Sequence, residues 1–162
     1  MSKVARLAAF TLNTPNLSNQ AQFYTDRWGL EAVEEHAGSV YLRAEGPRHH
    51  VLSLHESQEK GLRSIVFEAT PGYGLNRIHE ELLEAGVEVV SGPVGNPHAG
   101  IAKGLTFKDP DGNLIEIVEG IDVNHEKYGN RDVKPQDVNH AVVESPDATD
   151  CTSSTQRPWA LG

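Results

Sequence analysis

Cysteine, basic residues and long apolar runs are scarce in this sequence, and each shortage excludes a class of protein. The one cysteine, Cys151, has no partner for a disulfide and cannot by itself build a thiolate metal cluster. Fourteen Lys and Arg against 23 Asp and Glu give a net charge of −9, which argues against a nucleic-acid partner. No apolar run approaches the roughly 20 residues that span a bilayer, and no signal-peptide core follows Met1. We therefore expect a cytoplasmic protein with no membrane partner, in which any metal is held by His, Asp or Glu.

Aromatic residues make up only 6% of the chain, but apolar residues at helical spacing still predict two helices. The apolar positions of the first are Leu17, Ala21, Tyr24 and Trp28, and those of the second are Leu75, Ile78, Leu82 and Leu83. These patterns predict helices near residues 16–28 and 74–85, which end at Gly29 and Gly86. Similar strand-like segments follow both glycines. The first 120 residues therefore read as an internal repeat.

Short β-favouring runs flank both helices in the same order. They predict strands at residues 6–12, 32–35, 40–44 and 51–54 in the first half, and at 63–69, 87–90, 101–108 and 113–118 in the second. Each half reads strand, helix, strand, strand, strand. Two such units packed together predict an α+β domain, whose mainly antiparallel sheet curves around a shared cleft and whose helices lie outside.

The chain changes character after residue 120. We interpret residues 1–120 as one folded module, 121–137 as a polar linker and 138–147 as the first strand of an incomplete second module. No amphipathic helix can be drawn through residues 148–162, and we expect this tail to be disordered.

Two segments carry a family resemblance. The run from Asn16-Leu17 through Phe23-Tyr24 to Gly29-Leu30, together with Phe107-Lys-Asp-Pro-Asp-Gly-Asn-Leu-Ile-Glu116, resembles the vicinal oxygen chelate superfamily of glyoxalases, bleomycin-resistance proteins and type I extradiol dioxygenases. The segment 48–54 and the linker into Lys134-Pro135 are most similar to the N-terminal module of a two-module extradiol ring-cleaving dioxygenase. The resemblance implies paired βαβββ units, Fe(II) as the parent family's cofactor, and a small aromatic or catechol-type ligand. It also implies that only the second module carries the iron.

The resemblance further implies where metal ligands would lie. The family takes a His from the first strand of a module, a His from the fifth and a Glu from the eighth, and these positions fall on Ala9, Ser64 and Glu116. A facial triad needs two His and one carboxylate, so the first module should be free of metal, and we expect this chain to bind no stoichiometric iron. His140 precedes Asp147 by the same separation as Ala9 precedes Asn16. His140 therefore resembles the first iron ligand of the second module, as an ancestral position in an incomplete site.

The other polar residues have simpler interpretations. His49 and His50 are adjacent, so in a strand they would point to opposite faces and could not share a metal. We expect His98 to have a structural or solvent role in a loop. Glu116 is expected to be a half-buried carboxylate paired with Arg6, Arg63 or Lys103.

Three functions stay open at this point. The first is a fragment of an extradiol dioxygenase, a non-catalytic N-terminal module that is inactive alone. The second is a metal-free module that binds a small apolar or zwitterionic molecule, in a cleft lined by Ala9, Thr11, Ser64, Val66 and Glu116. The third is a truncated or frameshifted product with no independent role. Assembly into a homo-oligomer is left open with each of them.

Overall fold

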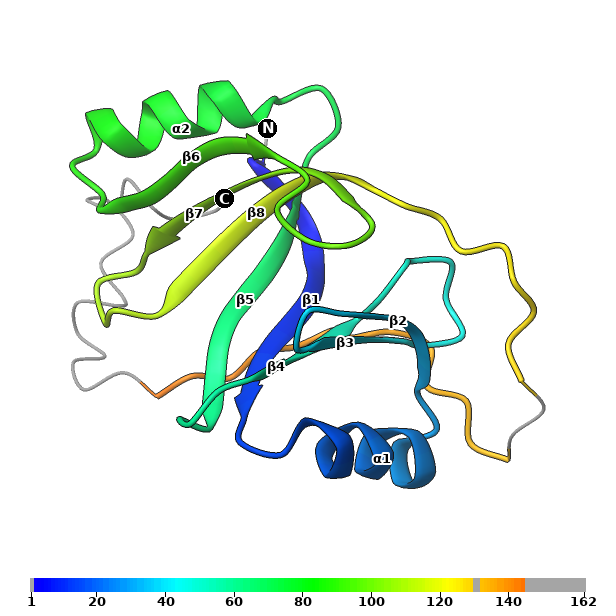
Figure 1. Cartoon of the computed structure of the whole chain (residues 1–162). Coiled ribbons are helices and arrows are strands. Elements are labelled where there is room, and N and C mark those ends of the chain that lie inside the picture. Colours follow the sequence, from blue (N-terminus) through cyan, green and yellow to red (C-terminus); the bar gives the residue numbers. More distant parts are fainter. Residues whose placement is uncertain (1, 130–131, 145–162) are drawn as a thin grey trace.

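A computed structural model of the protein describes residues 2–129 and 132–144, and it contains two βαβββ units in sequence (Figure 1). The first unit comprises β1 (Val4–Thr14), α1 (Leu17–Trp28), β2 (Glu31–His36), β3 (Ser39–Arg43) and β4 (Leu52–Glu56). The second comprises β5 (Gly61–Ala69), α2 (Leu75–Glu84), β6 (Val89–Gly95), β7 (Ile101–Lys108) and β8 (Leu114–Ile121). Both predicted helices and all eight predicted strands are present, each within a few residues of its expected place.

The eight strands form one open sheet in the order β2-β3-β4-β1-β5-β8-β7-β6. The two units meet at the centre, where β1 and β5 pair antiparallel. Within each unit the last strand pairs parallel with the first, as β4 does with β1 and β8 with β5. Leu12 and Ala69 lie in the equivalent strands β1 and β5, as the repeat requires. The α+β class of paired βαβββ units is thereby confirmed.

Both helices cover the same outer side of the sheet, and alternation along the strands separates this side from the concave one (Figure 1). The core under α2 contains Ile78, Phe107 and Ile117, all at most 1% exposed. The core under α1 contains Leu42 and Leu54, which are fully buried. The two helices thus leave the opposite, concave side of the sheet for polar residues.

The first helix is fixed mainly at its ends. The Asn16 carboxamide oxygen accepts the Asn19 backbone N–H at 3.1 Å and caps the N-terminus. Gly29 ends the helix in the left-handed region at φ 76°, as the sequence predicts. A side chain at Gly29 would also meet the carbonyl oxygen of Val133, so the glycine lets the C-terminal segment approach the helix end.

The segment after β8 returns along the first unit. The Tyr128 hydroxyl donates to the Gly29 carbonyl, and the Glu45 backbone N–H donates to the Pro135 carbonyl at 2.8 Å. Val138 packs against the cores under both helices. Residues 132–144 contain no strand within the described part of the chain, so the prediction of a second-module strand at 138–147 stays a prediction. The predicted disordered tail, residues 148–162, lies outside the described residues.

Among the helices of the described residues, none is both long and apolar enough to cross a membrane.

Candidate functional site

Five residues that the sequence assigns to a cleft lie side by side on the three central strands. Thr11 of β1 pairs with Ser64 of β5, and Ala9 pairs with Val66. Val66 in turn pairs with Glu116 of β8. All five are at most 7% exposed. The strand register therefore brings them together, under a cover of other side chains.

Glu116 is the charged centre of this group, and both of its carboxylate oxygens are engaged. The Ser64 hydroxyl donates to Oε1, and His98 Nε2 donates to Oε2 at 2.5 Å. The prediction that Glu116 pairs with Arg6, Arg63 or Lys103 is wrong, because none of these three described residues forms a hydrogen bond or an ion pair with it. Arg6 pairs instead with Glu68 at 2.6 Å. His98 lies in the loop between β6 and β7, as expected, and its contact with the carboxylate is a structural role and not a solvent-exposed one.

The environment keeps Glu116 ionised. Burial by itself would raise the pKa of Glu116, because it penalises the charged form. The hydrogen bond and the charge of His98, the hydrogen bond from Ser64 and the charge of Arg63 outweigh burial and lower that pKa below its ordinary value. Glu116 and His98 therefore form a tight polar pair at the middle of the concave face.

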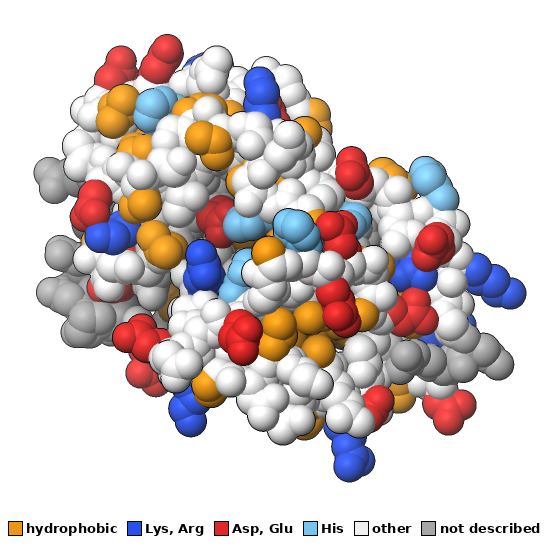
Figure 2. All heavy atoms as spheres, viewed as in Figure 1, with side chains coloured by type: hydrophobic (Ala, Val, Ile, Leu, Met, Phe, Trp, Pro, Cys, Tyr) orange, Lys and Arg blue, Asp and Glu red, His pale blue; other side chains and the backbone are white. Residues whose placement is uncertain are grey.

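Three more histidines surround this pair. His49 and His50 precede β4 in a segment that is not a strand, and their Nδ1 atoms lie 3.0 Å apart. The prediction that they point to opposite faces is therefore wrong, because it assumed a pleated backbone. His50 and His55 both lie edge-on to the Tyr41 ring, at centroid distances of 5.0 and 6.4 Å. Figure 2 shows histidine side chains gathered near the middle of one face of the molecule.

Two of these histidines are held neutral. Burial, then the charges of His49 and His98, lower the pKa of His50 to about 3. Burial, then the charges of Arg63 and His98, lower the pKa of His55 to about 4. His55 Nδ1 lies 2.7 Å from the Ser39 hydroxyl, whereas its buried Nε2 has no hydrogen-bond partner among the described residues. The face thus combines neutral imidazoles with one ionised carboxylate.

Two loops close over the concave face. The His49 backbone N–H donates to the Asp122 carbonyl at 2.9 Å, and the Asp122 N–H donates to the Gly100 carbonyl at 2.8 Å. Any side chain at Gly100 would collide with the His49 ring, so the loops at residues 47–50 and 96–100 are in close contact. The central residues are consequently shielded from solvent, and the prediction of a cleft lined by them did not include this cover.

The residues at the three ligand positions that the resemblance implies do not fit a facial triad of two imidazoles and a carboxylate. Ala9 has no ligating atom, and the Ser64 hydroxyl is a neutral group already donating to Glu116. In the described part of the chain, no three or more His, Cys, Asp or Glu side chains are arranged to hold a metal ion.

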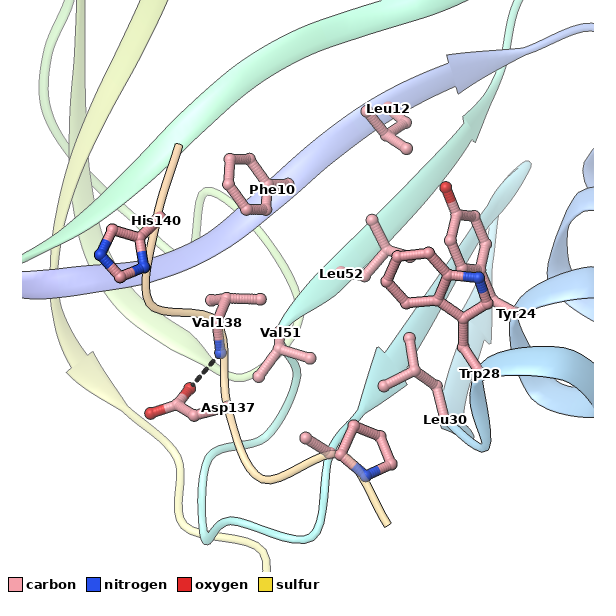
Figure 3. A pocket seen from close by; sticks show the side chains of 12 residues that line it. Phe10, Leu12, Tyr24, Trp28, Leu30, Val51, Leu52, Asp137, Val138 and His140 are labelled. Carbon is pink, nitrogen blue, oxygen red and sulfur yellow. Dashed lines mark hydrogen bonds between the residues drawn. The ribbon is translucent and has the colours of Figure 1, made fainter. Parts of the chain in front are cut away.

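A cavity lies on the other side of the sheet, where the sequence predicted no site. Its volume is about 410 Å³, and it lies between the sheet, α1 and the segment 135–140 (Figure 3). The lining residues are Phe10, Leu12, Tyr24, Trp28, Leu30, Ala44, Val51, Leu52, Pro135, Asp137, Val138 and His140. His140 therefore lies at the edge of this cavity and away from Glu116. The sequence signal for the cavity is the pair of large aromatic residues on α1, Tyr24 and Trp28, which the sequence analysis used only to predict the helix.

The sequence pattern of the Glyoxalase/Bleomycin resistance protein/Dioxygenase superfamily matches residues 6–117. Metapyrocatechase of Geobacillus stearothermophilus is 34% identical over 117 residues, which are 70% of this chain and 34% of that protein. Biphenyl-2,3-diol 1,2-dioxygenase 3 of Rhodococcus globerulus is 27% identical over 99% of this chain and 93% of its own length. The Mn(II)-bound glyoxalase from Novosphingobium aromaticivorans superposes with a TM-score of 0.69 at 25% identity, over 87% of this chain and 44% of that one. The chain thus spans about a third of the metapyrocatechase.

Proposed function

Because the chain belongs to the Glyoxalase/Bleomycin resistance protein/Dioxygenase superfamily, we propose that it is a non-catalytic module of an extradiol-dioxygenase-like protein. The observation that carries the proposal is the state of Glu116. Its two oxygens are taken by Ser64 and His98, and Ala9 and Ser64 stand at the two positions where the resemblance implies imidazoles. Such a module does not hold iron at the family's position and does not open catechol rings by itself.

The module's part in the larger protein is then structural. Its β1–β5 pairing and its two helices form a platform, and residues 121–137 lead from it toward a second module. In this proposal His140 occupies the position of that module's first ligand. One cysteine without a disulfide partner fits a reducing compartment, so a cytoplasmic location is part of the proposal.

Anaerobic loading tests the proposal directly. The full chain is incubated with Fe(II) or Mn(II), desalted, analysed for metal and assayed with catechol for the yellow ring-cleavage product. We expect far less than one metal per chain and no product, because one carboxylate does not replace a preorganised triad. One tightly held metal per chain, with turnover that Glu116→Gln abolishes and the control Glu119→Gln keeps, would overturn the proposal.

A second candidate is an independent protein that binds a small molecule without a metal on the concave face. The side-by-side placement of the five cleft residues on β1, β5 and β8 supports this candidate. Binding would place an apolar or zwitterionic molecule against Thr11, Val66 and Glu116, after the loop that carries His98 has moved aside. Calorimetric titration of the chain with an apolar or zwitterionic small molecule, in the presence of a metal chelator, tests this candidate. Affinity that changes in His98→Ala and is unaffected by the chelator would support it over the first.

A further inference from the structure

The cavity under α1 has three walls, which come from different parts of the chain. One wall is the sheet, through Phe10, Leu12 and Leu52, and another is the helix, through Tyr24 and Trp28. Figure 3 shows these side chains around a common space. Protein interiors are ordinarily close-packed, with few voids larger than a water molecule. A space of about 410 Å³ is within the range typical of small-molecule sites.

The third wall is the segment 135–140, and polar contacts tie it down. Asp137 forms an ion pair with the buried Arg48, and Arg48 also donates to the carbonyls of Leu7 and Ala8 at 3.0 and 2.8 Å. The Asp137 carboxylate accepts the Val138 backbone N–H as well. These contacts, which lie at the edge of the cavity, hold Val138 against the two cores.

The charges of the lining residues determine which charge a ligand can carry. Of the described lining residues, Asp137 is the only acidic one, and Arg48 already neutralises it. No Lys or Arg is among the described lining residues. Phe10, Tyr24 and Trp28 offer ring faces and edges, which favour aromatic partners. The hydroxyl of Tyr24 and the indole N–H of Trp28 add hydrogen-bonding groups without charge.

We propose that the cavity between α1, the sheet and residues 135–140 binds a neutral, apolar small molecule of one or two aromatic rings. The site is separate from Glu116 and lies on the other side of the sheet, so it does not depend on the function proposed above. An apolar ligand there displaces water that apolar walls hold poorly.

The probe for the test is the neutral two-ring dye 6-propionyl-2-(dimethylamino)naphthalene, titrated into the full chain carrying Trp159→Phe. Trp28 is then the only tryptophan, and energy transfer from Trp28 to the dye reports binding beside α1. We expect one dye per chain and saturable transfer. Absence of binding to both this chain and the unaltered one overturns the proposal.

Matched variants locate the dye. Val138→Phe fills the cavity from the segment and Ala44→Phe fills it from the sheet side, and each should weaken binding by about tenfold. Val142→Phe is the control, because Val142 is 93% exposed on the same segment, and it should change the affinity by less than about twofold. Circular dichroism verifies that each variant is folded. Equal dye affinity in Val138→Phe, Ala44→Phe and Val142→Phe overturns the proposal.

Two further outcomes would identify a different occupant and would also overturn it. Dye affinity that increases as the protein is diluted would identify a second copy of the chain as the natural occupant of the cavity. Dye affinity that is higher in Trp159→Phe than in the unaltered chain would identify the chain's own C-terminal residues instead.

Discussion

The two halves of the molecule repeat one topology and stabilise their helices differently. In the second half, α2 buries Leu75, Ile78 and Leu82, although no side chain among the described residues caps its N-terminus. In the first half, none of residues 17–28 is buried, whereas Asn16 and Gly29 cap both ends. A shared order of strands and helices therefore does not imply shared packing. The space that α1 leaves against the sheet is the cavity of Figure 3.

The strongest test of this comparison makes one substitution in each helix. Leu82→Ala in α2 removes a side chain that is 1% exposed and should lower the free energy of unfolding by about 3 kcal/mol. Leu17→Ala in α1 removes a half-buried side chain and should cost only about 1 kcal/mol. Urea unfolding of both variants measures the difference. Equal losses would show that α1 contributes as much burial as α2.

The next test lowers the pH and compares the contributions of the two halves to the concave face, where the first half supplies His50. Its pKa is about 3 in the folded chain and about 6.5 when exposed, so the unfolded chain takes up a proton first as the pH falls. Stability should therefore fall from pH 7 to pH 5, by about 2 kcal/mol through His50. His55 acts in the same direction, with a smaller effect because it is only half-buried. Urea unfolding at both pH values should show about 2 kcal/mol of this dependence removed in His50→Gln, with the contribution of His55 left, and all of it retained in the control His125→Gln.

The cap of α1 is the next smaller contribution. Asn16→Ala leaves the Asn19 N–H without its acceptor and should cost about 1 kcal/mol. Asn16→Ser keeps an acceptor at this position and should recover most of the loss. Thermal unfolding followed by circular dichroism compares the two variants. A loss of the same size in both would assign the effect to something other than the cap.

The smallest effect is expected on the exposed face of α2. Arg77 pairs with Glu81 at 2.9 Å one turn away, and its side chain is 63% exposed. Arg77→Ala should therefore change the free energy of unfolding by less than about 0.5 kcal/mol. Differential scanning calorimetry at low and high salt measures it. A larger loss would indicate that the ion pair, and not burial alone, holds α2 on the sheet.

Most of the fold could be predicted from local patterns. The spacing of Leu75, Ile78 and Leu82 is a helical one, and the runs around β5 and β8 are rich in β-favouring residues with no proline inside. Both signals are local and need no knowledge of distant contacts. The pairing of β1 with β5 follows from the repeat, because each half-sheet has an edge strand whose backbone groups can pair with the edge strand of the other half.

The contacts of the candidate site could be predicted only in part. The family resemblance indicated Ala9, Ser64 and Glu116, and the strand register does bring them together. His50 and His98 were missed as their neighbours because both lie in loops, whose paths are not encoded in hydrophobic periodicity. The cavity was missed for a similar reason: a helix with an apolar stripe predicts a buried face, but not how closely that face approaches the sheet.

The connection between the halves has a consequence for how the fold is held together. Only residues 57–60 join β4 to β5, and three of these four are exposed. The halves also meet through the β1–β5 ladder, the contacts over the concave face, and the packing of Leu7, Phe10 and Val138 against the core under α2. The protein can thus be regarded as an intramolecular dimer, in which a short tether sets the effective concentration of one half for the other. Lengthening that tether lowers the effective concentration without removing a single contact between the halves.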